Sequence, residues 1–183
     1  MFFGMLISTT GSSMIWPFQM IYITEKLNVE LAVVTMLVPF QSLAGITSSF
    51  IAGPIIDRTG RKGVMIFALV MHGLTFVLLS QATTLWQFGV LLAMVGSFNP
   101  LYRSASDAMM ADLVPPKDRV DAYSLLRMSN NLGVAIGPAV GGFIATQSYT
   151  VACLLAAAGM VTYGLMMTFL ARETLPSKTS QAV

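Results

Sequence analysis

Charged residues are scarce in this sequence. Only 10% of its 183 residues are Asp, Glu, Lys or Arg, whereas 55% are hydrophobic. A water-soluble domain carries about 25% charged residues, so this chain has too few to cover a surface that faces water. The composition excludes an ordinary soluble protein and predicts an integral membrane protein.

Cysteine and histidine are almost absent. The single cysteine, Cys153, excludes an intramolecular disulfide and a cysteine-based metal site. The single histidine, His72, argues against a histidine-rich metal site, and we interpret it as a satisfied packing residue, with a protonation role as the alternative. The sequence also lacks the ATP-binding pattern G-x-x-x-x-G-K-[ST] and the catalytic patterns H-E-x-x-H and G-x-S-x-G. We therefore expect no metal, no cofactor, no nucleic-acid partner and no enzymatic activity.

Six apolar runs are long enough to cross a bilayer, whose hydrocarbon core of about 30 Å needs about 20 helical residues. They cover approximately residues 2–24, 31–56, 63–82, 85–111, 120–146 and 150–171. No basic residue precedes the first run, so we interpret it as a retained helix and not as a signal peptide. The sequence predicts an all-α bundle of six transmembrane helices over residues 1–172, and a polar tail or the start of a linker over residues 173–183.

The basic residues are distributed unevenly between the loops. With the amino terminus inside, the inner segments contain seven Lys or Arg residues: Arg58, Arg61, Lys62, Lys117, Arg119, Arg172 and Lys178. The outer segments contain only Lys26. Because cytoplasmic loops are enriched in Lys and Arg, this distribution predicts a multi-pass protein of the cell membrane with both termini in the cytoplasm.

Polar residues inside the first, fourth and fifth predicted spans are spaced so that they share one helical face. Such a face should contact protein or a water-filled cavity and not lipid. Seven of these residues are our candidates for lining a substrate or proton cavity: Trp16, Gln19, Asn99, Arg103, Asp107, Arg127 and Asn131.

The charged members of this set are costly within a membrane, by about 2.5–3.5 kcal/mol each at mid-span. Arg103 and Asp107 are four residues apart, which allows an ion pair that could either orient the bundle or take part in transport. Arg127 leaves one positive charge in excess. A missing acid, an anionic substrate group or Asp57 could balance it, and the residues do not choose among the three.

The fifth predicted span contains the run GVAIGPAVGG at residues 133–142. Gly133, Gly137 and Gly141 are four apart on one helix edge, where small residues allow two backbones to approach closely. Pro138 removes one backbone hydrogen bond and is expected to bend the helix.

The loop GPIIDRTGRKG at residues 53–63 concentrates charge between two apolar runs. Asp57 lies at the carboxyl end of a predicted helix, where the macrodipole disfavours an anion. It therefore needs another partner, and Arg61 is one candidate within the chain.

These two motifs resemble those of the major facilitator superfamily. The loop is similar to that family's pattern G-x-x-x-D-R-x-G-R-[RK] between the second and third helices, with matches at Gly53, Asp57, Arg58, Gly60, Arg61 and Lys62. The run in the fifth span is similar to the pattern G-x-x-x-G-P-x-x-G-G of its drug–proton antiporters, with matches at Gly133, Gly137, Pro138, Gly141 and Gly142.

The resemblance implies the amino-terminal six-helix half, a 3+3 inverted repeat, of a twelve-helix secondary transporter. It implies efflux of small molecules or drugs by proton antiport through alternating access. It also implies that the loop is a latch in which Asp57 contacts the eleventh helix of the other half. Leu92 stands where the family's fourth-helix motif has an arginine, so that arginine's role does not pass to Arg103, and Asp107 remains the candidate proton site.

The expected partners are a small-molecule substrate, the lipid bilayer, and a missing carboxyl-terminal half or a second chain. The alternative interpretation is a truncated, non-transporting fragment, or a half-transporter that needs a second six-helix chain.

Overall fold

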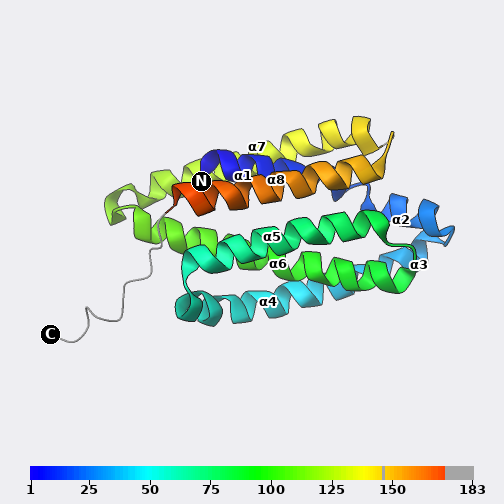
Figure 1. Cartoon of the computed structure of the whole chain (residues 1–183), viewed down its shortest axis with the longest axis horizontal. Helices are drawn as coiled ribbons and strands as arrows, with labels where there is room; N and C mark the ends of the chain where they lie inside the picture. The colour runs from blue at the N-terminus through cyan, green and yellow to red at the C-terminus, as the bar shows by residue number, and fades with distance from the viewer. Residues whose placement is uncertain (146, 172–183) are drawn as a thin grey trace.

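The computed structural model describes residues 1–145 and 147–171. The predicted tail, Arg172 and Lys178 lie outside the described residues. The described residues form helices that run roughly along one axis (Figure 1). These are α1 (Phe2–Ile15), α2 (Gln19–Leu27), α3 (Leu31–Thr35), α4 (Val38–Thr59), α5 (Arg61–Gln81), α6 (Leu85–Leu113), the 3₁₀ helix η1 (Pro116–Asp118), α7 (Arg119–Ala145) and α8 (Tyr149–Leu170).

The last four predicted spans each correspond to one helix, α5 to α8. The prediction of one continuous helix over residues 2–24 is wrong, because the chain turns at residues 16–18 between α1 and α2. Pro17 has no N–H to continue the α-helical ladder, and the Phe18 N–H instead bonds the Ile15 carbonyl three residues back, at 3.1 Å.

The second predicted span is also divided. A turn at residues 36–37 separates α3 from α4, and a proline lies in the first turn of α4, where it leaves no extra backbone acceptor unsatisfied. Asn28, in the left-handed conformation with φ of 51°, ends α2 before this segment.

By length and composition, three segments within the described ranges are apolar enough to cross a membrane: Leu31–Thr59, α5 and α8. Helix α1 is apolar but shorter. Helices α6 and α7 have 29 and 27 residues and are long enough, but they carry the charged and amide side chains noted above. This composition is expected of helices that face a cavity.

The principal helix contacts follow a two-fold pattern. Helix α1 lies against α7 and α8, α4 against α6, and α5 against both α6 and α8 (Figure 1). Exchanging α1 with α6, α4 with α7 and α5 with α8 leaves this set of contacts unchanged. The first three spans are therefore packed as the last three are, which confirms the predicted 3+3 repeat.

The most apolar packing lies between α5, α6 and α8. Leu69 and Phe76 of α5, Leu92 and Met109 of α6, and Met160 of α8 are almost completely buried there. Two of the helices that form this core, α6 and α8, begin at residues whose side chains cap the helix. Thr84 forms a capping box with Gln87 at the start of α6, and Ser148 accepts the Val151 N–H at the start of α8.

Glycines bring α7 against α1, whereas their spacing predicts only a close approach to some other helix. A methyl group at any of the three ladder glycines would overlap Thr9, Ser13 or the Met14 backbone of α1. Side-chain hydrogen bonds cross the same contact: Ser13 Oγ donates to the Gly133 carbonyl at 2.9 Å, and Ser129 Oγ donates to the Phe2 carbonyl at 2.8 Å. The predicted close approach is confirmed, whereas a role of these glycines in antiport stays a prediction.

The related pair α4 and α6 uses the same arrangement. A Cβ at Gly45 would lie 3.2 Å from the Gly96 carbonyl oxygen, and one at Gly96 would overlap the Gln41 carbonyl. Ser48 Oγ donates to the Ser97 carbonyl at 2.6 Å. Both long polar helices are thus held to their neighbours by small residues and hydroxyl bonds.

The substitution Gly141→Ala should destabilise the protein, because the added methyl group meets the Met14 backbone, which cannot move aside. We expect the free energy of unfolding to fall by about 1–3 kcal/mol. Gly142→Ala is the matched control. Its Cβ would lie 3.5 Å from the Phe18 ring, an ordinary contact, and alanine favours the helix by up to about 1 kcal/mol. Thermal unfolding in nanodiscs measures both, and equal losses would contradict the α1–α7 contact.

Candidate functional site

Two adjoining pockets collect the polar side chains of the bundle. The first, here the α6–α7 pocket, has a volume of about 540 Å³ and is lined by Arg103 and Asp107 of α6 and Tyr123, Arg127 and Asn131 of α7, among others. The second, the α1–α6 pocket, has a volume of about 190 Å³ and reaches from α1 across α5 and α6. Arg103 and Asn130 line both, so the pockets form one polar wall.

All seven cavity candidates lie on this wall. The α6–α7 pocket contains Arg103, Asp107, Arg127 and Asn131, and the α1–α6 pocket contains Trp16, Gln19, Asn99 and again Arg103. The structure brings them together from α1, α2, α6 and α7. Their part in transport stays a prediction.

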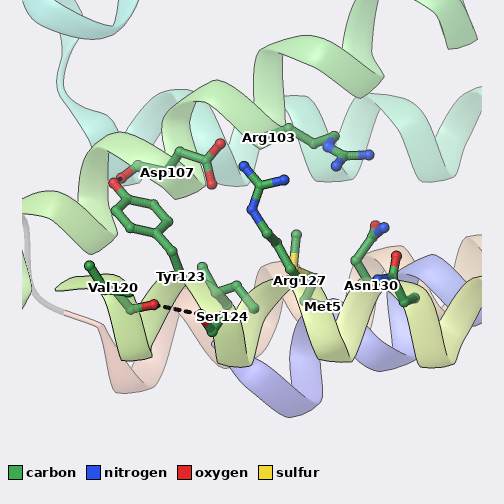
Figure 2. A pocket seen from close by; sticks show the side chains of 10 residues that line it. Met5, Arg103, Asp107, Val120, Tyr123, Ser124, Arg127 and Asn130 are labelled. Carbon is green, nitrogen blue, oxygen red and sulfur yellow. Dashed lines mark hydrogen bonds between the residues drawn. The ribbon is translucent and has the colours of Figure 1, made fainter. Parts of the chain in front are cut away.

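The expected ion pair between Arg103 and Asp107 is not formed. In the part of the chain that the structure describes, these side chains make no ion pair with each other. Figure 2 shows Arg103 pointing away from Asp107, while Arg127 of α7 points toward the Asp107 carboxylate. Helical side chains lean toward the amino end of the helix, so an arginine that precedes an acid by four residues leans away from it.

A hydrogen bond from Tyr123 connects α7 to α6 beside Asp107. The tyrosine hydroxyl donates to the Asp107 backbone carbonyl at 2.9 Å. The bond sets Arg127, one helical turn further along α7, opposite the Asp107 side chain (Figure 2). The wall therefore carries Asp107 between two arginines: Arg127 points toward its carboxylate, and Arg103 lies at the junction of the two pockets, near enough to act on its charge.

His72 is packed as predicted, but no described residue bonds its ring. Its side chain is completely buried and stacks on Phe76, with ring centroids 4.8 Å apart. Neither ring nitrogen has a hydrogen-bond partner among the described residues. His72 belongs to the wall of the α1–α6 pocket. The predicted packing role is therefore confirmed, with Phe76 supplying the stacking surface, while satisfaction of the ring nitrogens stays a prediction.

The charged motif at residues 53–63 forms the end of α4, the turn at Gly60 and the start of α5, and it contacts the ends of α6 and α8. Gly60, with φ of 102°, makes the turn between α4 and α5, a conformation that favours glycine. Arg61 forms an ion pair with Asp112 of α6 and donates to the Ala108 carbonyl at 3.3 Å. Lys62 donates to the carbonyls of Thr168 and Ala171 at 2.8 and 2.7 Å. Arg61 is therefore engaged by α6 and is not the partner of Asp57.

Two residues of these sites, Asp112 and Gln41, are not identified by the sequence analysis. Asp112 directly follows the fourth predicted span, and nothing local distinguishes it as the partner of Arg61, 51 positions earlier. Gln41 lines the α1–α6 pocket from α4. A lone amide within the apolar run of α4 was the available signal for it.

The family model described as Major Facilitator Superfamily matches residues 1–182. This chain belongs to the major facilitator superfamily. The resemblance inferred from the two motifs is confirmed, and it places the chain in a family of multi-pass membrane transporters and not of enzymes.

Several superfamily members are similar to this chain over one part of their length. A Na(+), Li(+), K(+)/H(+) antiporter of Planococcus maritimus is 32% identical over 96% of this chain and 42% of its own. The multidrug resistance protein MdtH of Yersinia pestis is 25% identical over 85% of this chain and 39% of its own. The crystal structure of the human organic anion transporter MFSD10 has the same fold, with a TM-score of 0.75, 19% identity, and coverage of 96% of this chain and 47% of that one.

The chain thus spans less than half the length of these superfamily members, which agrees with one six-helix half. Two residues of the superfamily loop are outward-facing in this half. Asp57 is exposed and makes no hydrogen bond or ion pair within the described ranges, and a Cβ at Gly53 would meet no atom within 4 Å. Their contact with another six-helix unit stays a prediction.

Asp57→Asn and Asp112→Asn form a matched test of the superfamily loop. Asp57 lies at the carboxyl end of α4 and has no partner among the described residues, so its neutralisation should leave stability unchanged or raise it by up to about 1 kcal/mol. Asp112 is partly buried and paired with Arg61, so the same change there should cost about 1–2 kcal/mol. Thermal unfolding of both variants measures this. A large loss from Asp57→Asn would show that this carboxylate has a good partner within the six helices.

Proposed function

We propose that this chain is the amino-terminal half of a secondary active transporter that exports small molecules from the cell by proton antiport, through alternating access. Both termini would lie in the cytoplasm, at the end of the bundle that holds Arg61 and Lys62. The observation that carries the proposal is the polar wall, to which α2, α6 and α7 contribute charged or amide side chains and α1 contributes hydroxyls at membrane depth. Such intramembrane groups mark ion and substrate pathways.

The depth of the wall fits a transport site. Arg103 lies nine residues from Asp112, which is about 13 Å along α6 at 1.5 Å per residue. This distance is close to the middle of a hydrocarbon core about 30 Å thick. Binding sites of secondary transporters lie near the midplane, between units that rock against each other.

Asp107 is our candidate for the proton-binding residue. It is the one acid among the residues that line the two pockets. Arg127 points toward its carboxylate (Figure 2). Protonation of Asp107 would remove a negative charge beside Arg127 and raise the positive charge of the wall. A proton and a cationic group of a substrate would then compete for this place, as antiport requires.

The relatives are consistent with this assignment. One is an antiporter that uses protons, and another is a multidrug resistance protein. The energy source would be an ion gradient, and no cofactor is needed. The cell membrane is the expected location.

A second candidate function is a half-transporter that works only with another six-helix chain, or a fragment without transport activity. It is favoured by the outward-facing Asp57 and Gly53 and by the coverage of less than half of the relatives. Export that requires co-expression of a second six-helix unit would support the half-transporter, and its absence in every combination would support the fragment.

Asp107→Asn should abolish export driven by a pH gradient while leaving the protein folded. The full-length protein is placed in vesicles that carry a pH gradient across their membrane. Accumulation inside the vesicles is followed for ethidium, a lipophilic cation, and for anilinonaphthalene sulfonate, an anion of similar size. We expect a rate loss of about 100-fold or more for the transported probe, because the amide cannot carry the proton.

Asp121→Asn is the control, since Asp121 is an exposed acid in the first turn of α7 outside both pockets. It should transport at the wild-type rate. Proton-driven export that survives Asp107→Asn at full rate would refute Asp107 as the coupling residue.

A further inference from the structure

Several buried polar side chains near the α1–α6 pocket have no hydrogen-bond partner. Within the described ranges they include both ring nitrogens of His72, Thr9 Oγ1, Ser106 Oγ and Tyr163 Oη. All four residues are at most 5% exposed. Buried polar groups in folded proteins are nearly always bonded to protein or to ordered water. This cluster is therefore a place where water is expected.

The cluster extends from the α1–α6 pocket, here also called the transport pocket, toward the end of the bundle where α1 begins and α6 and α8 end. His72, Thr9 and Tyr102 line the α1–α6 pocket, and the rings of His72 and Tyr102 are 6.4 Å apart between centroids. Ser106 follows Tyr102 by four residues and so lies on the same face of α6. Tyr163 of α8 lies close to Ser106, although the two hydroxyls form no direct hydrogen bond among the described residues.

Tyr163 connects the cluster to a separate pocket. That pocket, here called the cytoplasmic pocket, has a volume of about 400 Å³ and is lined by Met1, Leu113 and Leu170, among others, at the predicted cytoplasmic end of the bundle. At 1.5 Å per residue, Tyr102 lies about 16 Å and Ser106 about 10 Å from the end of α6, and Tyr163 lies about 10 Å from the end of α8. Tyr102 thus lies deeper than Ser106, and Tyr163 lies at the depth of Ser106 and borders the cytoplasmic pocket.

Every member of this series can accept one proton while it donates another. A neutral imidazole has one bare nitrogen and one N–H, and a hydroxyl has both lone pairs and a proton. The rings are held in place: His72 is stacked on Phe76, and the Tyr163 ring occupies space that a side chain at Gly4 would fill.

The surroundings of His72 contain no acid that would hold its proton. From α6 it faces Tyr102 and, along the pocket, Arg103; from α1 it faces Thr9. Helix α8 presents Ala157 and Met160 beside Gly73, the next residue of α5. None of the residues lining the α1–α6 pocket is acidic.

We propose that His72, Tyr102, Ser106 and Tyr163, together with bound water, form a proton path between the transport pocket and the cytoplasmic pocket. A proton arriving at the bare nitrogen of His72 is matched by the departure of the proton on its other nitrogen to the next water or hydroxyl. Each group therefore ends with the number of protons it began with. The path rests on the proposed proton antiport, and it would serve Asp107, the neighbour of Ser106 on α6.

His72→Phe separates this path from a packing role. Phenylalanine keeps the size of the ring and its stacking on Phe76, but it cannot pass a proton. In proteoliposomes of the full-length protein with a trapped pH dye and ethidium as the probe, ethidium-driven proton flux should fall about 10-fold or more. The unfolding temperature should not fall, because an apolar ring replaces a polar one that no described residue bonds.

Two tyrosines of α8 supply a matched pair. Tyr163→Phe should slow the proton flux as His72→Phe does. Tyr149→Phe should not, although the Tyr149 hydroxyl is also buried without a partner, because Tyr149 lies at the other end of α8. Wild-type flux in both His72→Phe and Tyr163→Phe would overturn the path. If His72→Phe does not fold, Tyr163→Phe decides alone.

A second measurement does not depend on transport. In ¹⁵N-histidine NMR of the wild-type protein in nanodiscs, the signal of His72 is the one lost in His72→Phe. The path predicts fast exchange of its ring N–H with water despite its complete burial. Protection from exchange would overturn the path. Fast exchange without any ethidium-driven proton flux would leave the path intact and count against the proposed antiport.

Discussion

An ionised side chain at membrane depth must meet water or an opposite charge, and this constraint arranges the rest of the structure. Arg103, Asp107 and Arg127 all lie on one wall, with the amides of Asn99 and Asn131 among them. Helices α5 and α8 bear no ionised or amide side chain at this depth; they form the apolar core together with one face of α6 and are among the segments apolar enough to span a bilayer. The separation of polar from apolar helices thus follows from the cost of a charge in lipid.

The wall can exist only because the helices behind it approach closely. The glycines of α7 leave room for the backbone and side chains of α1 to pack closely, and Gly45 and Gly96 allow the same close packing between α4 and α6. The two contacts are related by the exchange of the first three spans with the last three. One packing arrangement, used twice, therefore positions both the α1 and the α6 sides of the polar wall.

Much of this organisation could be predicted from sequence, because it depends on local patterns. The positions of the last four spans follow from apolar length, and a close helix approach at Gly137 follows from spacing, although spacing does not identify α1 as the partner. The turn at Pro17 had a local signal that the length of the apolar run concealed. The pairing of Arg61 with Asp112, the turning of Arg103 away from Asp107 and the surroundings of His72 depend on how distant helices dock, which no local pattern contains.

The central claim is that the polar wall faces water and not lipid. Single cysteines test it in a Cys153→Ala background, at Asn130 on the wall and at Leu74 on the exposed face of α5. A membrane-impermeant methanethiosulfonate needs a hydrated thiolate to react. The account predicts rapid labelling of Asn130→Cys and very slow labelling of Leu74→Cys in the intact membrane. Equal rates, or faster labelling of Leu74→Cys, would contradict it.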